Sequence, residues 1–385
     1  MFNNPFSPVF GGRPGIFFGR DELRKRFKIA LADPSSEDRA LFVTGTRGSG
    51  KTTLVELYSR MASTAGWKTI DLGPEHVVQS LLRGLVGYDE KTTTISPQVS
   101  LSILGSGGSV GGISTSEATH LDEADLSAVF LAACREHPKG VFVSIDEVQK
   151  VPESEVSMVC NAFQLAIRKG LNAILVVAGL PHAHGEIIRY EGCTFMRRAS
   201  HVELTLLSNA EAHDALSNAL EKRTGGLGVA SEDLDRLVQA SYGHPYVLQL
   251  LGYYLVTVVN RGEPKRKHEA TRKEVDEAIE LAISAYETRA LQPLIAELST
   301  DSLRYLKAMA NSLGPDRTVQ TSEVAKALGL EVGKAGYLRR GLLADGIVIS
   351  AGYGKLMFNV PYLAAYVQHG AGPSTELERV MEWGL

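Results

Sequence analysis

Short strand-like segments alternate with helical patterns along the first half of the chain. These segments cover residues 41–44, 67–71, 141–145, 173–178 and 201–204. Two of them, 141–145 and 173–178, are mainly apolar runs, which are typical of strands that are buried on both faces. The helical segments between them predict parallel, right-handed connections. We therefore expect a three-layer α/β fold, with a parallel sheet between helices, over residues 17–206.

From residue 207 onward the pattern becomes helical. Ser208-Asn-Ala-Glu211 has the spacing of a capping box and predicts the start of a helix. Gly243-His244-Pro245 precedes an apolar helix, with the proline in the first turn, where it is tolerated. Residues 207–292 are therefore predicted to form an all-helical domain, and Pro293 marks its end.

The last part of the chain changes pattern again. Helices are predicted over 301–312, 321–328 and 332–345, the second of them capped by Thr321 or Ser322, and two strands over 347–350 and 356–360. This order predicts a winged-helix domain over 293–370. Three segments remain: an N-terminal arm (1–16), a Ser/Thr/Gly-rich insertion (91–118) and a C-terminal tail (371–385). The composition of the insertion fits either a β-hairpin or a loop.

A glycine-rich motif joins the first predicted strand to its helix. Gly45-Thr-Arg-Gly-Ser-Gly-Lys51-Thr52 has the spacing of a P-loop, in which backbone N–H groups and a helix N-terminus surround a phosphate. Lys51 is expected to lie between the β- and γ-phosphates, and the Thr52 hydroxyl to bind Mg²⁺. The expected nucleotide-binding residues here are Gly45, Thr46, Arg47, Gly48, Ser49, Gly50, Lys51, Thr52 and Thr53. The motif predicts that ATP or ADP binds with Mg²⁺.

Two carboxylates end the third predicted strand. Val141-Phe-Val-Ser-Ile145 leads directly into Asp146-Glu147, at the edge where parallel strands present their functional residues. Asp146 is expected to hold Mg²⁺ through water, and Glu147 to activate the water that attacks the γ-phosphate. A solvated acidic turn is the alternative interpretation.

Together with Gly19-Arg20 before the P-loop and the Gly243-His-Pro245 turn, these motifs resemble the STAND and archaeal-initiator branches of the AAA+ ATPases. The resemblance implies an ATP-dependent switch with a helical lid, in which Gly19, Arg20 and Pro245 lie on the base side of the nucleotide. For the Pro245 turn, a plain capping turn is the alternative.

The resemblance also implies an arginine that acts in trans on a neighbouring subunit. Arg198 matches its position best and Arg197 second, although surface arginines before an edge strand fit the pattern too. These ATPases carry a polar residue at the end of the fourth strand, where this chain has Ala178-Gly179. Either His182 or His184 substitutes, or the polar residue is absent and turnover is slow.

Charge and composition limit the partners. The chain has 385 residues and a formal charge of −4, so any nucleic-acid surface must be local. Residues 301–370 carry eight basic and five acidic residues. Their expected contacts with double-stranded DNA are Lys334, Tyr337, Arg339, Arg340 and Lys355. A winged helix that contacts a protein partner is the alternative.

The cysteines and the lack of targeting segments indicate where the protein is located. Three widely spaced cysteines and the lack of a secretory signal or membrane span predict a cytoplasmic protein without a membrane partner. The first hypothesis is an ATP-hydrolysing switch in which the nucleotide state sets the position of the winged helix and thereby its binding to DNA. A protein partner or self-association is a further expectation. The alternatives are a DNA loader or initiator that uses ATP for assembly, and a nucleotide-holding scaffold with little turnover.

Overall fold

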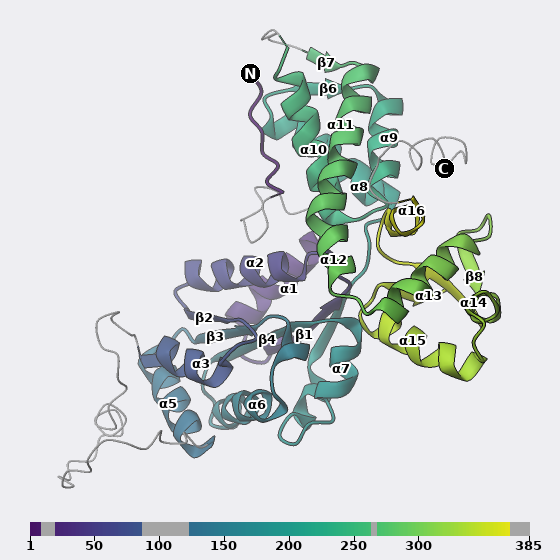
Figure 1. Cartoon of the computed structure of the whole chain (residues 1–385). Helices are drawn as coiled ribbons and strands as arrows, with labels where there is room; N and C mark the ends of the chain where they lie inside the picture. The colour runs from purple at the N-terminus through teal and green to yellow at the C-terminus, as the bar shows by residue number, and fades with distance from the viewer. Residues whose placement is uncertain (9–19, 87–122, 263–267, 370–385) are drawn as a thin grey trace, which may run out of the picture. The chain divides into compact units, whose positions relative to one another are not determined.

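The computed structural model describes residues 1–8, 20–86, 123–262 and 268–369 (Figure 1). Gly19, residues 9–16 of the expected arm, the 91–118 insertion and the 371–385 tail lie outside the described residues. The chain divides into two compact units. The first unit comprises 1–20, 45–53 and 204–385, and the second comprises 21–44 and 54–203.

A five-stranded sheet forms the centre of the second unit, and it confirms the predicted α/β class. The strands are β1 (Ala40–Gly45), β2 (Lys68–Leu72), β3 (Val141–Ile145), β4 (Ala173–Gly179) and β5 (Ser200–Leu204). Their order is β2-β3-β4-β1-β5. The pairs β2–β3, β3–β4 and β1–β4 are all parallel. Thr44 pairs with Gly179 and Ile145 with Val177, so β1, β3 and β4 end at the same edge.

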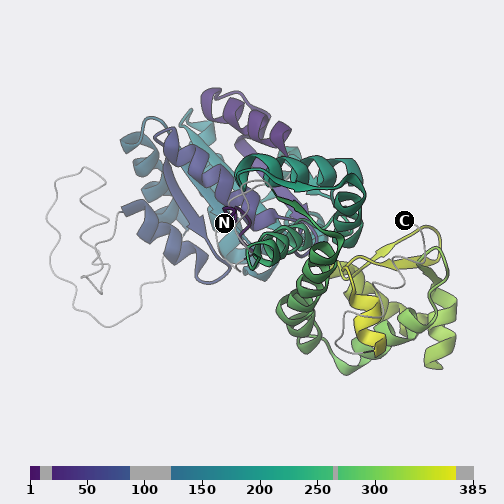
Figure 2. The same cartoon turned by 90° about the horizontal axis from the view of Figure 1, so that it is seen from above.

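Helices cover both faces of this sheet, as Figures 1 and 2 show. One face carries α1 (Asp21–Ala32) and α2 (Lys51–Thr64), and the other carries α3 (Val77–Val86), α5 (Glu123–Glu136) and α6 (Glu153–Arg168). The remaining helical elements are η1 (Glu37–Arg39), η2 (Val148–Lys150), α7 (Pro181–Ile187) and η3 (Thr194–Arg198). On the first face Phe27 stacks on Tyr58, with ring centroids 4.0 Å apart, and meets the edge of Phe142. Each ring buried in this way contributes about 1.5–3 kcal/mol.

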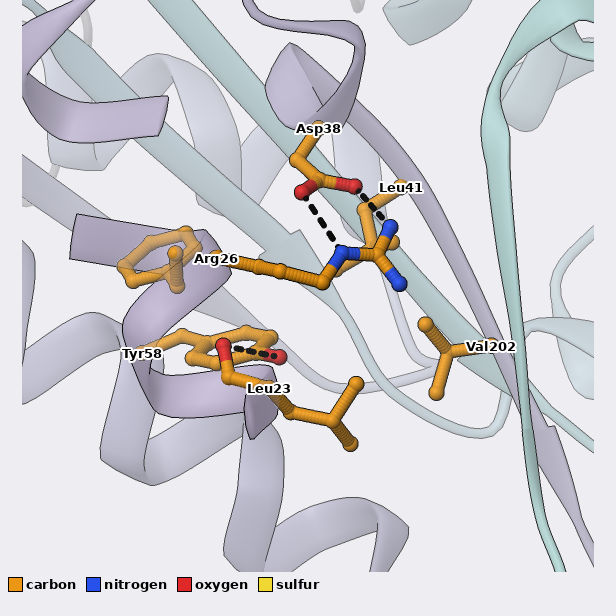
Figure 3. A pocket seen from close by; sticks show the side chains of 7 residues that line it. Leu23, Arg26, Asp38, Leu41, Tyr58 and Val202 are labelled. Carbon is orange, nitrogen blue, oxygen red and sulfur yellow. Dashed lines mark hydrogen bonds and ion pairs between the residues drawn. The ribbon is translucent and has the colours of Figure 1, made fainter. Parts of the chain in front are cut away.

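A polar contact lies beside this aromatic stack (Figure 3). Arg26 of α1 donates two hydrogen bonds to the Asp38 carboxylate, at 3.1 and 2.5 Å. The Tyr58 hydroxyl donates to the Leu23 carbonyl at 3.4 Å. The cavity among these side chains has no volume for even one water molecule. It is therefore a packed structural contact and not a ligand site.

Helices dominate the middle of the first unit, as the sequence predicts. They are α8 (Asn209–Arg223), α9 (Ser231–Ser241), α10 (Pro245–Val259), α11 (Arg272–Tyr286), the π-helical turn η4 (Glu287–Leu291) and α12 (Gln292–Ala296). Two short strands, β6 (Leu227–Val229) and β7 (His268–Ala270), pair in parallel. The predicted capping box of Ser208 and Glu211 is present at the start of α8. Pro245 occupies the first turn of α10, also as predicted.

The first residues of the chain pack on this helical domain. Phe6 is only 3% exposed and lies against α10 at Gly252. The Asn260 side chain accepts a hydrogen bond from the Phe2 N–H at 2.7 Å and donates one to the Phe2 carbonyl at 2.9 Å. Residues 1–8 have no regular secondary structure, so these contacts hold them in place.

The C-terminal elements of the first unit form a small α/β group, drawn in yellow-green in Figure 2. They are α13 (Thr300–Asn311), β8 (Thr318–Gln320), α14 (Thr321–Leu328), α15 (Val332–Ala344), β9 (Val348–Ser350), β10 (Lys355–Phe358) and α16 (Leu363–His369). Both predicted strands pair, and β8 adds a third strand that was not predicted, in the antiparallel order β8-β10-β9. The predicted cap of α14 by Thr321 or Ser322 is wrong, because Gln320 and Glu323 form the capping box.

Candidate nucleotide-binding site

The glycine-rich motif forms a tight loop at the end of β1, which we call the phosphate loop (residues 45–52). Gly48 and Gly50 have φ angles of +74° and +96°. Residues with a Cβ are strained in this left-handed region, so the turn depends on these glycines. The loop leads into α2 at Lys51, whose first N–H groups have no partner within the helix and form a natural anion site.

Two polar side chains of the phosphate loop are buried. Lys51 is 5% exposed, and its ammonium donates to the Thr46 carbonyl at 3.0 Å. Ser49 is 2% exposed, and its hydroxyl has no hydrogen-bond partner in the part of the chain that the structure describes. Thr52 and Thr53 follow in the first turn of α2, with Thr52 exposed. The loop therefore places a cation and a hydroxyl inside a turn of backbone donors.

Parts of the first unit far along the chain contact the phosphate loop. The buried His244 imidazole lies with Nε2 3.1 Å from the Arg47 carbonyl oxygen. Arg47 also forms an ion pair with Glu297, at 3.0 Å, near the end of α12. Pro245, the predicted base-side residue, follows His244 directly as the first residue of α10. No motif in the sequence indicates a role for His244 or Glu297.

Arg20 directly precedes α1 in the chain, and its side chain lies beside the residues that lead into α8, in the same unit. Its φ is +74°, and its guanidinium donates to the Thr205 carbonyl at 2.6 Å. Burial lowers the pKa of Arg20, and the nearby Glu211 carboxylate opposes that shift. Its predicted neighbour in the motif, Gly19, lies outside the described residues.

The acidic turn at the end of β3 is tightly hydrogen-bonded in the second unit. Asp146 accepts a hydrogen bond from the Glu147 N–H at 2.8 Å. Glu147 has a φ of +52°, and its carboxylate accepts a hydrogen bond from the Gln149 side chain at 2.8 Å. Lys150 lies 3.4 Å from the same carboxylate. The turn thus fixes the direction of the Glu147 side chain.

Gln149 is a candidate functional residue that the sequence analysis missed. Besides its contact with Glu147, its carbonyl oxygen accepts from the Leu180 N–H at 3.2 Å, just after β4. A Cβ at Gly179 would lie 2.9 Å from that oxygen, so the small residue permits this contact. Gln149 therefore links the acidic turn to the strand end where the expected polar residue is missing. Its place two residues after Glu147 is the one signal that the sequence offered.

The two histidines considered as substitutes lie after β4, in α7. The His184 ring stacks on His201 of β5, with centroids 4.2 Å apart, and burial lowers the pKa of His184, with a smaller effect from His201. His201 Nε2 lies 2.7 Å from the Thr44 hydroxyl, at the end of β1. His184 is thus joined to the sheet edge through His201, and a role for it or for His182 stays a prediction.

The two arginines of η3 differ in their surroundings. Arg197 donates from Nε to the Ile188 carbonyl at 3.2 Å. Both side chains are exposed to solvent. Because this hydrogen bond holds the Arg197 side chain, Arg198 is the better placed of the two for contact with another molecule.

The predicted DNA-contacting residues fall into two groups. Lys334, Tyr337 and Arg340 are exposed on α15, and the Tyr337 side chain is 72% exposed. Arg339 is half-buried and close to Tyr305, while Lys355 lies 3.3 Å from Asp316 in an ion pair. The turn between β9 and β10 adds a fully exposed Tyr353, which the sequence analysis missed. The exposed cations and aromatics on α15 and this turn are available to a partner.

The described helices include none with both the length and the apolar character needed to cross a membrane. Residues 16–177 match the AAA ATPase domain family, and residues 289–367 match a domain of unknown function. No curated protein sequence matches the chain.

Solved structures are similar to this chain over most of its length. The Aeropyrum pernix ORC2 protein, solved as ADPNP-ADP complexes, is 14% identical and has a TM-score of 0.57, with 97% of each chain covered. The Aeropyrum pernix ORC1 protein in complex with DNA is 16% identical over 96% of this chain and 93% of that chain, with a TM-score of 0.46. A variant of Thermotoga maritima RuvB is 15% identical over 90% of this chain and 94% of that chain, with a TM-score of 0.47. Residues 16–177 therefore match an AAA ATPase domain, and the chain shares the fold of the Aeropyrum pernix ORC2 protein.

Proposed function

We propose that the chain is a molecular switch that binds Mg-ATP and hydrolyses it. The observation that carries this proposal is the phosphate loop, with two left-handed glycines and a buried lysine at a helix N-terminus. The match of residues 16–177 to the AAA ATPase domain family supports it.

The residues of the loop fit a bound triphosphate. The Lys51 ammonium neutralises the β- and γ-phosphates, and the backbone N–H groups from Gly48 to Thr52 surround the β-phosphate. The buried Ser49 hydroxyl, without a partner among the described residues, adds a donor inside the loop. Arg20 and Pro245 then lie on the base side.

Hydrolysis needs a metal ion and an activated water. Thr52 and Asp146 are the residues that would hold Mg²⁺, which would supply positive charge against the charge that develops on the phosphate oxygens. Glu147 orients a water for attack on the γ-phosphorus and accepts its proton as the bond to ADP breaks. Arg198 of a neighbouring copy stabilises the same charge, which requires self-association. The hydrogen bond from Gln149 sets the direction of the Glu147 carboxylate before the reaction.

The elements of the first unit that contact the phosphate loop respond to the nucleotide bound there. His244 meets the Arg47 carbonyl from the start of α10, and Glu297 pairs with Arg47 from the end of α12. We assign residues 17–206 to the ATPase domain, 207–292 to the lid and 293–370 to a winged helix. A bound nucleotide changes the loop that all three share, so it shifts the lid and winged helix between two positions.

Nucleotide binding and turnover test the proposal separately. Isothermal titration with Mg-ATP is expected to show binding that Lys51→Ala abolishes. The Glu147→Gln protein is expected to bind ATP normally and to release no phosphate in a steady-state assay. Absence of binding by the natural sequence would refute the proposal. Tight binding with no turnover would instead identify the nucleotide-holding scaffold.

A second candidate function, DNA binding, is favoured by the surface of α15. Lys334 and Arg340 flank the exposed Tyr337 ring, which offers a cationic and aromatic face to a duplex. The half-buried Arg339 and the paired Lys355 are less available than expected from the sequence.

Salt dependence tests this second function. Duplex affinity, measured by fluorescence anisotropy between about 50 and 200 mM salt, should fall steeply, and a Lys334→Ala/Arg340→Ala protein should show a slope smaller by about 2. Lys273→Ala, an exposed cation on α11, is the matched control. Equal slopes for all three proteins would exclude α15 as the DNA surface and favour a protein partner.

We also assign the protein to the cytoplasm. Its cysteines, Cys134, Cys160 and Cys193, are all free thiols buried in the fold, as expected in a reducing compartment.

A further inference from the structure

His244 is packed directly against one peptide unit of the phosphate loop. The residue is only 3% exposed, and Nε2 lies 3.1 Å from the carbonyl oxygen of Arg47. A Cβ on Gly48 would overlap the imidazole ring, so the ring sits flush against the Arg47–Gly48 peptide. Glycine is therefore needed at position 48 for two reasons, the left-handed φ and the close approach of this ring.

The protonation state of His244 follows from its surroundings. Burial lowers the pKa of His244 to about 4, so the ring is neutral at neutral pH. The hydrogen bond with the Arg47 carbonyl opposes this shift, and the nearby Lys51 ammonium adds a smaller lowering effect. A carbonyl oxygen can only accept, so the proton of the neutral ring resides on Nε2. Nδ1 is then an unprotonated acceptor, without a hydrogen-bond partner in the described part of the molecule.

This hydrogen bond determines where the next N–H points. In a trans peptide the C=O and N–H groups point in opposite directions, and none of the described peptides is cis. Since the Arg47 carbonyl faces the imidazole, the Gly48 N–H faces away from it. A hydrogen bond accepted by the carbonyl also polarises the peptide and strengthens its N–H as a donor.

We propose that His244 is a positioning residue of the nucleotide site, which holds the Arg47–Gly48 peptide so that the Gly48 N–H donates to a phosphate oxygen. This inference rests on the proposed binding of ATP. Helix α10 contains no arginine that could reach a phosphate. In its place, the lid acts on the nucleotide through a neutral imidazole and the loop backbone. The lid thereby contributes to affinity for ATP and ADP alike.

Two substitutions separate the N–H donor from the shape of the ring. His244→Gln keeps a donor at the place of Nε2, whereas His244→Met fills similar space without one. We expect Met to weaken the binding of both Mg-ATP and ADP about tenfold, and Gln to stay within about threefold of the natural sequence. His213→Met on α8 is the control and should leave both affinities unchanged. Circular dichroism melting verifies that each protein is folded.

The outcomes distinguish this inference from the proposed function. If the natural sequence binds neither ATP nor ADP, the proposed function fails. If it binds both and the Gln and Met proteins bind equally well or equally weakly, only the role of the His244 donor fails.

A measurement on the natural side chain covers the case in which the Met protein does not fold. Nitrogen-15 spectra of histidine-labelled protein at about pH 5.5 should contain a neutral ring protonated at Nε2, which shifts when ADP is added. His184→Gln removes the signal of the other histidine whose pKa is lowered. A ring protonated at Nδ1, or one that ADP does not affect, would overturn the proposal.

Discussion

Acidification is expected to destabilise the elements around His244, because this residue is buried in its neutral form. The folded pKa of about 4 lies below the ordinary value of 6.5. Between these two pH values the unfolded chain binds a proton that the folded chain does not. The contribution of His244 to stability is therefore complete above pH 6.5 and is lost as the pH falls toward 4.

The size of this effect follows from the two pKa values. Linkage gives a loss of about 2 kcal/mol between about pH 7.5 and 5, and about 3 kcal/mol by about pH 4. The groups that face the ring are the Lys51 ammonium of α2 and the Tyr286 ring of α11, whose centroid lies 5.9 Å away. Burial raises the pKa of Tyr286, so this phenol stays neutral over the whole range.

Hydrogen exchange of α10 is the most direct assay, because His244 immediately precedes this helix. After correction for intrinsic exchange rates, the opening constant of α10 amides should rise about thirtyfold between about pH 7.5 and 5. In the His244→Gln protein this rise should be absent. Carboxylates with a lowered pKa, such as Glu211 and Asp316, affect both proteins equally and cancel in the comparison.

Two results would refute this reasoning. One is the same pH dependence of α10 in both proteins, which would mean that other groups cause the loss. The other is stable protection of α10 down to about pH 5 in the natural sequence, which would mean that the ring is already charged or is not buried. Amides of α6, in the other unit, serve as the internal reference.

Three substitutions test other parts of the structure. Gly48→Ala should lower the free energy of unfolding by at least about 2 kcal/mol, because of left-handed strain and overlap with His244. Gly50→Ala should lower it less, since a Cβ there meets no neighbour. Urea titration measures both effects. Gln149→Leu should lower the rate of ATP hydrolysis about tenfold without changing ATP affinity, because the Glu147 carboxylate loses its oriented donor; equal rates would refute this. Asp38→Ala should reduce stability by about 1–2 kcal/mol, against less than about 0.5 kcal/mol for Glu22→Ala in an exposed pair.

The central strands could be predicted because they are buried on both faces. Residues 141–145 and 173–179 are entirely buried, so their sequences are mainly apolar runs. Such runs show where strands lie but not which strands pair. The order β2-β3-β4-β1-β5 depends on contacts between distant segments, for which the chain has no local signal. Strand β8 was missed for a related reason, since Thr318-Val-Gln320 has a single buried side chain.

The phosphate loop and the acidic turn could be predicted because their chemistry needs fixed residue types at fixed spacing. Their surroundings lack this property. Gln149 has its role because its side chain reaches both Glu147 and the backbone after β4. Phe6 could not be placed either, since it is buried against α10, some 246 residues further along the chain, at Gly252. An aromatic residue in a Gly- and Pro-rich segment gives no indication of such a partner.

His244 illustrates the limit most clearly. In the sequence it is an unremarked residue between a turn glycine and a helix-starting proline. Its chemistry arises only when α10 brings the ring to the Arg47 carbonyl, 197 residues earlier in the chain. Burial then removes its charge, and the carbonyl selects its tautomer. The same contact explains why the motif needs glycine at position 48 and not simply any flexible residue. A lid whose helix α10 lacks an arginine can thus still act on the nucleotide, through the backbone that holds it.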